Sequence, residues 1–371
     1  MTRSVAIIGT RGYPSYYGGF ETAVRKLAPF LADAGWDVTV YGRPGATKTT
    51  DPTLDPRIHT RVTRGLETKS LSTLTFGLTS CLDAMVRKPD VAVVMNVANG
   101  FWLPLLWMRG VPTLVNVDGI EWDRAKWGRV AKWVFRTGAR ATAKFGNRLV
   151  FDSIEISKRW ASEFRRDGDF IPYGGDEPDT LPLEQGLIHR GYVLMVARFV
   201  PENTVREFLQ AAEALSKRWN VVIVGSSGYG GELDESAAAL AEGNDSVRWL
   251  GHLSDDARLL SLWQHAGVYF HGHSVGGTNP ALVQAMACGA PIVARDTIYN
   301  REVLGVDGVF TAPEADHIEA TVDGLMKNPE LQEFEARRVA LRAREHYSWR
   351  DVCTKYATSM LLLANAKRVR R

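Results

Sequence analysis

Segments rich in apolar and β-branched residues alternate with amphipathic segments along most of this 371-residue chain. In its first half, strand patterns cover 5–9, 37–42, 90–96, 112–117 and 148–153, and helical patterns cover about 20–34, 72–87 and 124–145. A second series has strands at 192–199, 220–225, 247–251, 268–272 and 291–294, with helices at 203–218, 231–242, 255–265 and 279–288. Such alternation produces parallel sheets, because each helix returns the chain to the start of the next strand. The sequence therefore predicts an α/β protein with two doubly wound, Rossmann-like domains.

The two series are joined by IPYGGDEPDTLPLEQG at 171–186, which is rich in proline, glycine and acidic residues. We place a first domain at 1–180 and a second at 187–348. Ligands of open α/β sheets bind beyond the carboxyl ends of the strands. Two facing domains of this kind predict a ligand in the cleft between them.

Several features indicate a soluble or peripheral protein of the cytoplasm. The three cysteines, Cys81, Cys288 and Cys353, have neither metal-site nor disulfide spacing, which favours a reducing compartment. The N-terminal MTRSVAII lacks the layout of a signal peptide, and the most apolar stretch, 101–115, is interrupted by prolines and an arginine. Residues 1–180 carry 25 basic and 19 acidic side chains, against 20 and 23 in residues 181–371. This asymmetry suggests that the first half meets an anionic partner.

A glycine-rich loop, GTRGYPSYYGGFET at 9–22, follows the first strand. It does not match the G-x-G-x-x-G fingerprint of dinucleotide-binding domains, which argues against a dehydrogenase. Gly18 and Gly19 still precede a helix directly, so their backbone N–H groups and the helix dipole could hold an anion. The alternative is a long turn without a ligand.

The second half carries the motifs ARFVPENTVREFLQA (197–211), VVIVGSSG (221–228) and a longer run at 249–294 that includes AMACGAPIV. Together they resemble the nucleotide-binding domain of glycosyltransferase family 4, whose members have the GT-B fold. The segments GTRGYPSYYGGFET and VNVDGIEWDRAKW (115–127) look like a narrower branch that contains rhamnosyltransferases of polysaccharide biosynthesis. The resemblance covers nearly the whole chain. It implies a retaining, metal-independent hexosyltransferase whose C-terminal helix, 349–371, packs back on the first domain.

The same resemblance implies a set of site residues. Arg198 matches the arginine that grips the donor diphosphate, and Asp118 stands where many relatives have a histidine that touches the donor sugar. As a carboxylate, Asp118 could stabilise positive charge in an oxocarbenium-like transition state, with Glu121 close by in the same loop. A more ordinary role for Asp118 or Asp123 is an N-cap of the following helix, and Asp123 fits that role better. The predicted catalytic residues are Asp118, Glu121 and Arg198, and the predicted nucleotide-sugar contacts are Gly18, Gly19, Arg198, Asn203, Gly225, Gly251, His252, His273, Gly276, Gly277, Thr278, Asn279 and Gln284.

Three positions depart from the family pattern. Asn203 replaces a lysine that contacts phosphate, and Gly276 and Gln284 replace two glutamates that contact the donor sugar and the ribose. Gln284 can still hydrogen-bond a ribose, although without a charge. The substitutions leave room for a relative that binds nucleotide sugar without turnover.

The segment 124–148 holds eight lysine or arginine residues and no acidic one. If it is helical, Lys132, Arg136, Arg140, Lys144 and Arg148 form a cationic stripe with interleaved aromatic residues. We interpret it as a surface for anionic membrane lipid rather than for nucleic acid; the alternative is a solvated helix face.

The leading interpretation is a transferase that uses dTDP-L-rhamnose and a polyprenyl-diphosphate-linked saccharide acceptor, peripheral to the inner face of the plasma membrane. It needs no cofactor and no metal. The alternatives are the same fold with a UDP- or GDP-sugar, a silent nucleotide-sugar binder, and a sugar-nucleotide epimerase, although the acid and base residues of an epimerase are not evident.

Overall fold

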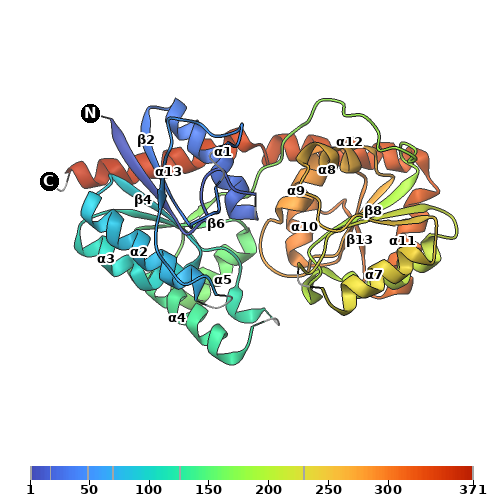
Figure 1. Ribbon diagram of the computed structural model, residues 1–371, viewed down its shortest axis with the longest axis horizontal. Coiled ribbons are helices and arrows are strands. Elements are labelled where there is room, and N and C mark those ends of the chain that lie inside the picture. The colour runs from blue at the N-terminus through green and yellow to red at the C-terminus, as the bar shows by residue number, and fades with distance from the viewer. Residues whose placement is uncertain are drawn as a thin grey trace. The chain divides into compact units, whose positions relative to one another are not determined.

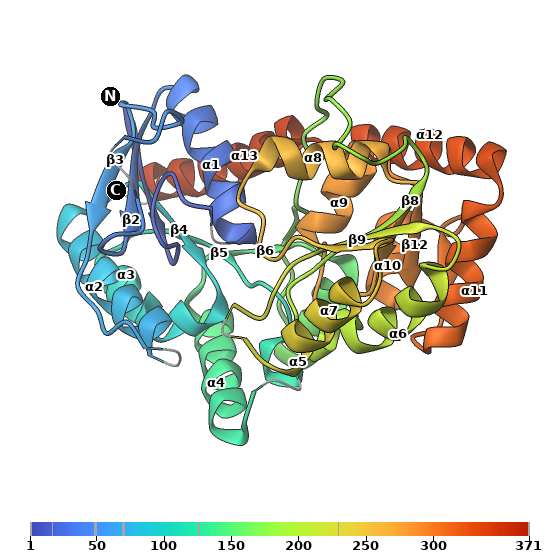
Figure 2. The same ribbon diagram turned by 45° about the vertical axis from the view of Figure 1, so that its right-hand side comes forward.

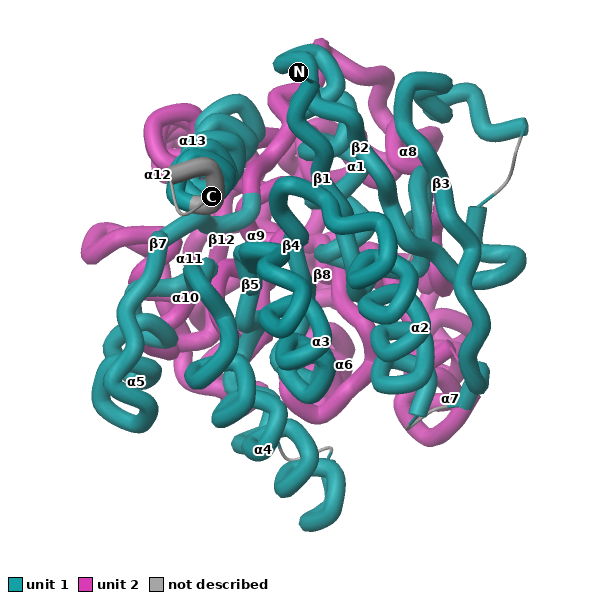
Figure 3. Tube along the Cα trace, turned by 90° about the vertical axis from the view of Figure 1, so that its left-hand side faces the viewer, with its two compact units in different colours: residues 1–173, 349–371 teal, residues 174–348 magenta. Residues whose placement is uncertain are grey.

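The computed structural model describes residues 2–16, 18–47, 50–68, 71–124, 127–228 and 230–369. The chain divides into two compact units, which Figure 3 shows in different colours. Unit 1 comprises residues 1–173 and 349–371, and unit 2 comprises residues 174–348. Each unit is a parallel sheet covered by helices (Figure 1), so the predicted pair of doubly wound domains is confirmed.

Unit 1 has a seven-stranded sheet in the order β3-β2-β1-β4-β5-β6-β7, and all its strand pairs are parallel. The strands are β1 (Arg3–Ile8), β2 (Trp36–Gly42), β3 (His59–Val62), β4 (Val91–Met95), β5 (Thr113–Asn116), β6 (Arg148–Phe151) and β7 (Asp169–Phe170). The helices are α1 (Gly19–Asp33), α2 (Ser72–Arg87), α3 (Leu103–Met108), α4 (Arg129–Phe145), α5 (Ile154–Phe164) and α13 (Trp349–Val369), with short 3-10 turns η1 (Val97–Trp102) and η2 (Glu121–Asp123).

The two faces of this sheet are covered by different helices. Side chains alternate along β1, so that Val5 and Ile7 point to the face where α1 and α13 lie. On α13, Val352, Tyr356 and Met360 are buried in the same core, which confirms that the C-terminal helix belongs with the first domain. Helices α2, α3 and α4 pack around η1. Figure 2 shows α2 and α3 side by side in this group.

Unit 2 has a six-stranded parallel sheet in the order β10-β9-β8-β11-β12-β13. The strands are β8 (Tyr192–Val196), β9 (Asn220–Val224), β10 (Val247–Trp249), β11 (Val268–His271), β12 (Ile292–Arg295) and β13 (Val309–Thr311). The helices are α6 (Val205–Leu215), α7 (Glu232–Glu242), α8 (Asp256–His265), α9 (Pro280–Ala287), α10 (Ile298–Leu304), α11 (Ala315–Met326) and α12 (Pro329–His346), with a 3-10 turn η3 (Pro201–Asn203). One core joins the sheet to α8, α9 and α12, and another joins it to α6 and α11.

The expected end of the first domain at residue 180 lies inside unit 2. The segment that follows residue 173 has no long regular element, but its backbone is bound to unit 2. The backbone N–H of Asp176 donates to Gln284 Oε1 (3.0 Å), and the N–H of Leu181 donates to Gln264 Oε1 (2.8 Å). These hydrogen bonds attach residues 174–180 to unit 2. The composition of the segment does not indicate them.

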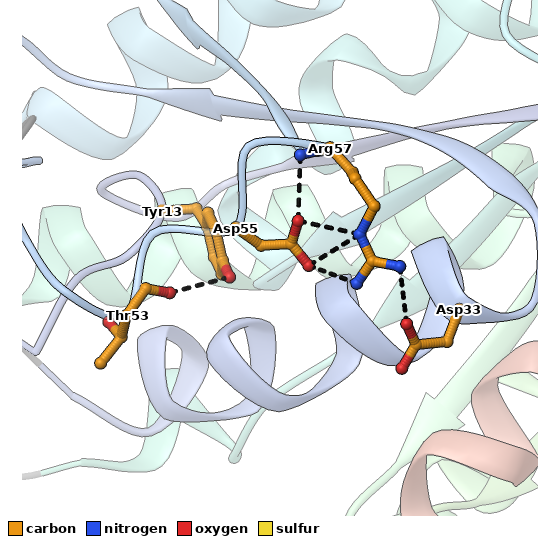
Figure 4. Close-up of polar contacts among 5 residues, drawn as sticks. All are labelled: Tyr13, Asp33, Thr53, Asp55 and Arg57. Carbon is orange, nitrogen blue, oxygen red and sulfur yellow. Dashed lines mark hydrogen bonds and ion pairs between the residues drawn. The ribbon is translucent and has the colours of Figure 1, made fainter.

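The β2–β3 connection is fastened to its neighbours by polar contacts (Figure 4). Arg57 donates to Asp33 at the end of α1 (2.7 Å) and to Asp55 within the connection (2.6 Å). The hydroxyl of Tyr13, in the loop after β1, donates to the carbonyl oxygen of Thr53 (3.4 Å). The connection therefore holds the glycine-rich loop in place from one side.

The predicted cationic stripe is shorter than expected. Lys132, Arg136, Arg140 and Lys144 lie on α4, but Arg148 belongs to β6 and is paired with Asp169. The helix ends at Phe145 because the chain turns there into the sheet. Residues 125 and 126 of the basic segment lie outside the described residues.

Candidate active site

The strand order of each sheet reverses at one place, and ligands of such sheets bind at that switch point. In unit 2 the switch lies between β8 and β11, and in unit 1 it lies between β1 and β4. The predicted site residues follow these strands or their neighbours.

In unit 2, the backbone at the ends of β8, β9 and β10 is packed tightly. The N–H of Gly225 donates to the carbonyl oxygen of Gly251 (2.7 Å). A Cβ on Gly225 would lie 1.7 Å from the carbonyl oxygen of Ala197, and its φ of +135° is one that side chains rarely adopt. Only glycine fits at this position. The close approach fixes the backbone immediately before Arg198.

Arg198 is exposed just past the carboxyl end of β8. Its carbonyl oxygen accepts a hydrogen bond from Asn203 Nδ2 (2.8 Å), which closes the turn before α6. Within the described part of the chain, its guanidinium forms no ion pair. An arginine held by its backbone, with its charge uncompensated, is suited to bind an anion bidentately.

Asn203 also orients a histidine. Its Oδ1 lies 2.6 Å from His273 Nδ1. Because the Nδ2 group donates to Arg198, the Oδ1 atom must accept, and His273 Nδ1 therefore carries the proton. At the position where the resemblance implies a lysine, Asn203 supplies a neutral amide that bonds the backbone of Arg198 and the ring of His273.

His271, at the end of β11, is almost fully buried. Its Nδ1 lies 3.0 Å from the hydroxyl of Tyr269, and its Nε2 finds no partner among the described residues. Burial lowers the pKa of His271 to about 3, so the ring is neutral at physiological pH. Its neighbour His273 is only partly buried, which makes it the better placed of the two to meet a ligand.

The predicted contacts Gly276, Gly277, Thr278 and Asn279 form a loop, here called the glycine nest, that directly precedes α9. Gly276 has a φ of +92°, Thr278 is buried, and the Asn279 side chain caps the helix by accepting from the N–H of Ala281 (2.9 Å). Gln284 lies further along α9, and its amide is engaged with the backbone of Asp176: Oε1 accepts from the N–H (3.0 Å) and Nε2 donates to the carbonyl oxygen (2.7 Å). A ribose contact by Gln284 stays a prediction, and it would compete with these two bonds. His252 is exposed beside Gly251.

In unit 1, Asp118 lies beyond β5 in a left-handed conformation with a φ of +63°. Its carboxylate accepts from Asn96 Nδ2 (2.9 Å), and its backbone N–H donates to Asn116 Oδ1 (2.9 Å). Asn96, at the end of β4, also has a positive φ, of +71°. Backbone strain of this kind concentrates at functional sites, because the surroundings must hold it. Two adjacent strand ends thus present one carboxylate in a fixed orientation.

A hydroxyl from the C-terminal helix supports this arrangement. Asn116 Nδ2 donates to the hydroxyl of Tyr356 on α13 (2.7 Å), and both side chains are buried. Burial, together with the nearby charges of Asp118 and Asp152, raises the pKa of Tyr173 well above its ordinary value. Tyr173 is therefore a neutral group close to Asp118. The sequence motifs did not indicate Asn96, Asn116, Tyr173 or Tyr356, because their significance depends on contacts between distant segments.

We expect Tyr356→Phe to weaken this support without abolishing the fold. The change removes the acceptor of Asn116 Nδ2 and leaves a buried donor unpaired, which costs about 1–3 kcal/mol. Denaturant unfolding measures the loss. Tyr16→Phe is a control, since that tyrosine is exposed and its hydroxyl bonds Asp51 and Thr53 in the β2–β3 connection. Equal losses in the two variants would contradict the role assigned to Tyr356.

Glu121 is buried and in contact with its own segment. Its Oε2 accepts from Trp127 Nε1 (2.8 Å), and its Oε1 lies 2.7 Å from Arg124 Nε. These contacts fix the turn η2 between Asp118 and α4. The geometry assigns Glu121 to holding the loop, and a direct part in the reaction stays a prediction.

The expected anion site at Gly18 and Gly19 already faces a carboxylate. Glu21, in the first turn of α1, is buried and accepts from the backbone N–H of Arg11 (3.1 Å). A Cβ on Gly18 would lie 3.4 Å from Glu21 Oε2. A phosphate bound there would have to share the helix terminus with this side chain.

The described residues also give findings on metal-ligand groups and on membrane-spanning helices. Among them, histidine, cysteine, aspartate and glutamate form no group of three or more suited to hold a metal ion. None of the helices searched there has the length and apolar character needed to span a membrane.

The amino-acid sequence matches two family descriptions. Residues 188–339 match "Glycosyl transferases group 1", and residues 18–171 match "Glycosyl transferase 4-like domain". The chain is 26% identical to the MMP α-(1→4)-mannosyltransferase of Mycolicibacterium hassiacum, over 95% of this chain and 96% of that protein. It is also 26% identical to the O-antigen chain mannosyltransferase B of Escherichia coli, where the match spans 53% of this chain and about half of that relative's length (52%).

The fold is shared with solved glycosyltransferase structures. The sucrose-phosphate synthase of Thermosynechococcus elongatus aligns with a TM-score of 0.82 at 17% identity, over 98% of this chain and 100% of that one. Anabaena HepE in complex with UDP-glucose aligns with a TM-score of 0.76 at 15% identity, over 97% and 99% of the two chains. The chain therefore belongs to the glycosyltransferases of GT-B fold, with a glycosyltransferase 4-like domain in its first half and a group 1 domain in its second.

Proposed function

We propose that this glycosyltransferase moves a sugar from a nucleoside diphosphate to an acceptor hydroxyl with retention of the anomeric configuration. The leading donor is dTDP-L-rhamnose. The acceptor is a saccharide or a polyprenyl-diphosphate-linked saccharide of cell-surface polysaccharide synthesis. The observation that carries the proposal is the unit 2 edge, where Asn203 bonds both the Arg198 carbonyl oxygen and the His273 ring, and where the glycine nest precedes α9. That edge offers one uncompensated cation and backbone N–H groups to a leaving diphosphate.

In this mechanism the leaving group takes part in the chemistry. The bond between the anomeric carbon and the phosphate oxygen breaks as the acceptor oxygen bonds to the same face of that carbon. The acceptor proton passes to the departing phosphate oxygen, so no protein nucleophile is required. Arg198 stabilises the negative charge that develops on the diphosphate, and Asp118 stabilises the positive charge on the sugar.

A second donor class has specific support. Both curated relatives described above are named mannosyltransferases, and the HepE structure contains UDP-glucose. A UDP- or GDP-sugar is therefore the alternative donor. Thermal-shift measurements with dTDP-L-rhamnose, UDP-sugars and GDP-sugars, followed by product detection with a lipid-diphosphate acceptor, distinguish these cases. Binding without product would leave the chain as a silent nucleotide-sugar binder.

We expect Arg198→Ala to weaken binding of dTDP by about 1.5–3 kcal/mol, the value of hydrogen bonds to a charged group. Calorimetry measures the affinity with and without EDTA, because the proposed reaction needs no metal. Arg206→Ala is the matched control: Arg206 is an exposed arginine on α6, paired with Glu232, and its loss should leave the affinity unchanged. An unchanged affinity of the Arg198 variant, or binding that requires a divalent cation, would contradict the proposal.

We further propose that the protein is cytoplasmic and docks peripherally on the inner face of the plasma membrane through residues 124–148. On α4, Trp133 is 63% exposed and Val130 is 77% exposed. They share the exposed side of the helix with Arg129, Arg136, Arg140 and Lys144. A helix face that combines cations with tryptophan is typical of interfacial helices. The attraction should decrease as salt rises, because it is electrostatic.

A further inference from the structure

A groove of about 410 Å³ lies between α4 and α5. Its lining residues are Arg136, Arg140, Ala143, Lys144, Glu163 and Phe164. The three cations come from successive turns of α4, so their side chains extend from one face of that helix. The opposite wall is the C-terminal turn of α5.

The groove carries a net positive charge. Among the described residues that line it, Glu163 is the one carboxylate, and it already accepts a hydrogen bond from Arg159 Nε (2.6 Å). The nearest lining cation, Arg136, lies 3.9 Å from Glu163 through its Nη2 atom. Within the described chain, Arg140 and Lys144 form no ion pair, and Lys144 lies over the ring of Phe145 (5.2 Å). Arg140 and Lys144 are therefore available to a ligand. Both belong to α4, so they line the same wall of the groove.

Apolar side chains accompany these cations. Trp133 lies one turn before Arg136 on the exposed face of α4, and Val130 precedes it. A dissolved phosphate would make no use of an exposed indole, whereas a lipid surface offers an interfacial layer in which tryptophan is favoured. Charge complementarity and the adjacent indole thus favour a lipid as the source of the anion.

We infer that the α4–α5 groove binds the phosphate of an anionic phospholipid headgroup, while Trp133 enters the same membrane surface. The inference rests on the proposed peripheral membrane location and makes it specific, since it places recognition in one groove rather than in the overall charge. Arg140 and Lys144 contact the phosphate, and Arg136 remains near Glu163.

The test compares two variants with equal loss of charge. Arg140→Gln/Lys144→Gln removes two cations from the groove, and Arg64→Gln/Lys88→Gln removes two exposed cations of unit 1 outside its lining. Co-sedimentation with phosphatidylglycerol vesicles measures the lipid concentration at half-binding. The groove variant should bind about 30-fold more weakly, since each cation near an anionic surface contributes a factor of about five. The control variant should stay within a few-fold of the wild type.

Two further variants should change the affinity for vesicles in opposite directions. Glu163→Gln removes the groove's carboxylate and should strengthen vesicle binding several-fold. Trp133→Ser should weaken binding to vesicles. Phosphatidylcholine vesicles should bind none of the proteins, and inorganic phosphate at millimolar concentration should not displace the wild type from phosphatidylglycerol.

The outcomes separate this inference from the proposed function. Equal weakening by the groove and control variants would show that net charge alone drives binding and would overturn the inference. Displacement by inorganic phosphate, or preferential binding of an RNA competitor, would also overturn it. Donor turnover without vesicles is measured in parallel. If the groove variant turns over the donor normally, the proposed transferase function stands, whether or not its vesicle binding is weakened.

Discussion

Asp118→Asn is expected to lower turnover by at least about 100-fold, in the range found when one group that stabilises transition-state charge is removed. The affinity for the donor should change only a few-fold, because the charge on the sugar develops during the reaction and not on binding. The asparagine oxygen can still accept from Asn96 Nδ2, which lies 2.9 Å from the native carboxylate, so the local fold should persist. Single-turnover kinetics and calorimetry measure the two quantities separately.

The same loop provides the control for this experiment. Asp123 is a second carboxylate close to Asp118 in the sequence, but its side chain is 48% exposed and pairs with Arg159 on α5. Asp123→Asn should therefore leave turnover within a few-fold of the wild type. If both variants retain turnover, Asp118 is a structural residue of the loop and the assigned catalytic role is wrong.

Gly225→Ala is expected to reduce the free energy of unfolding by about 3 kcal/mol or more. The added Cβ would meet the carbonyl oxygen of Ala197 at 1.7 Å, and a backbone atom in a sheet end cannot move aside easily. Donor binding should fall as well, since Ala197 precedes Arg198. Denaturant unfolding and calorimetry with dTDP measure the two effects.

A second variant, Gly228→Ala, separates the steric clash with the Ala197 carbonyl oxygen from the strain of a positive φ. Gly228 also has a positive φ, +82°, but a Cβ there would meet nothing within 4 Å. Gly228→Ala should cost only about 1–2 kcal/mol, the value of placing a side chain in the left-handed region. Similar losses in the two variants would mean that conformational strain, and not the close approach of the strand ends, explains the requirement for glycine at 225.

The alternation of apolar strands and amphipathic helices was sufficient to predict the architecture, because each buried strand and each helix leaves a local pattern. The helix expected at 72–87 agrees with α2. Strand β3 (His59–Val62) was missed, since it is a partly exposed edge strand whose polar residues carry little signal. Helix α5 was also missed, although Ser153 gives a recognisable cap by accepting from the N–H groups of Glu155 and Ile156.

Site residues could be predicted from the sequence only where they belong to a recognisable motif. Arg198 and the glycines at 225 and 276 stand in motifs of the second half, and the structure places them after strands or before a helix. The contact between Asn116 and Tyr356 joins residues 240 positions apart, so no local pattern could indicate it. Gln284 illustrates the opposite case: the motif predicts a ligand contact, whereas its amide is bonded to the backbone of Asp176.

The most direct test of the central claim is the anomeric configuration of the product. The protein is incubated with dTDP-L-rhamnose, UDP-sugars or GDP-sugars and a lipid-diphosphate-linked saccharide, and NMR is recorded on the product while the released nucleoside diphosphate is quantified. We predict one nucleoside diphosphate released per sugar transferred, and a new glycosidic bond with the same anomeric configuration as the donor. A product of inverted configuration, or donor binding with no product from any of these sugars, would contradict the account.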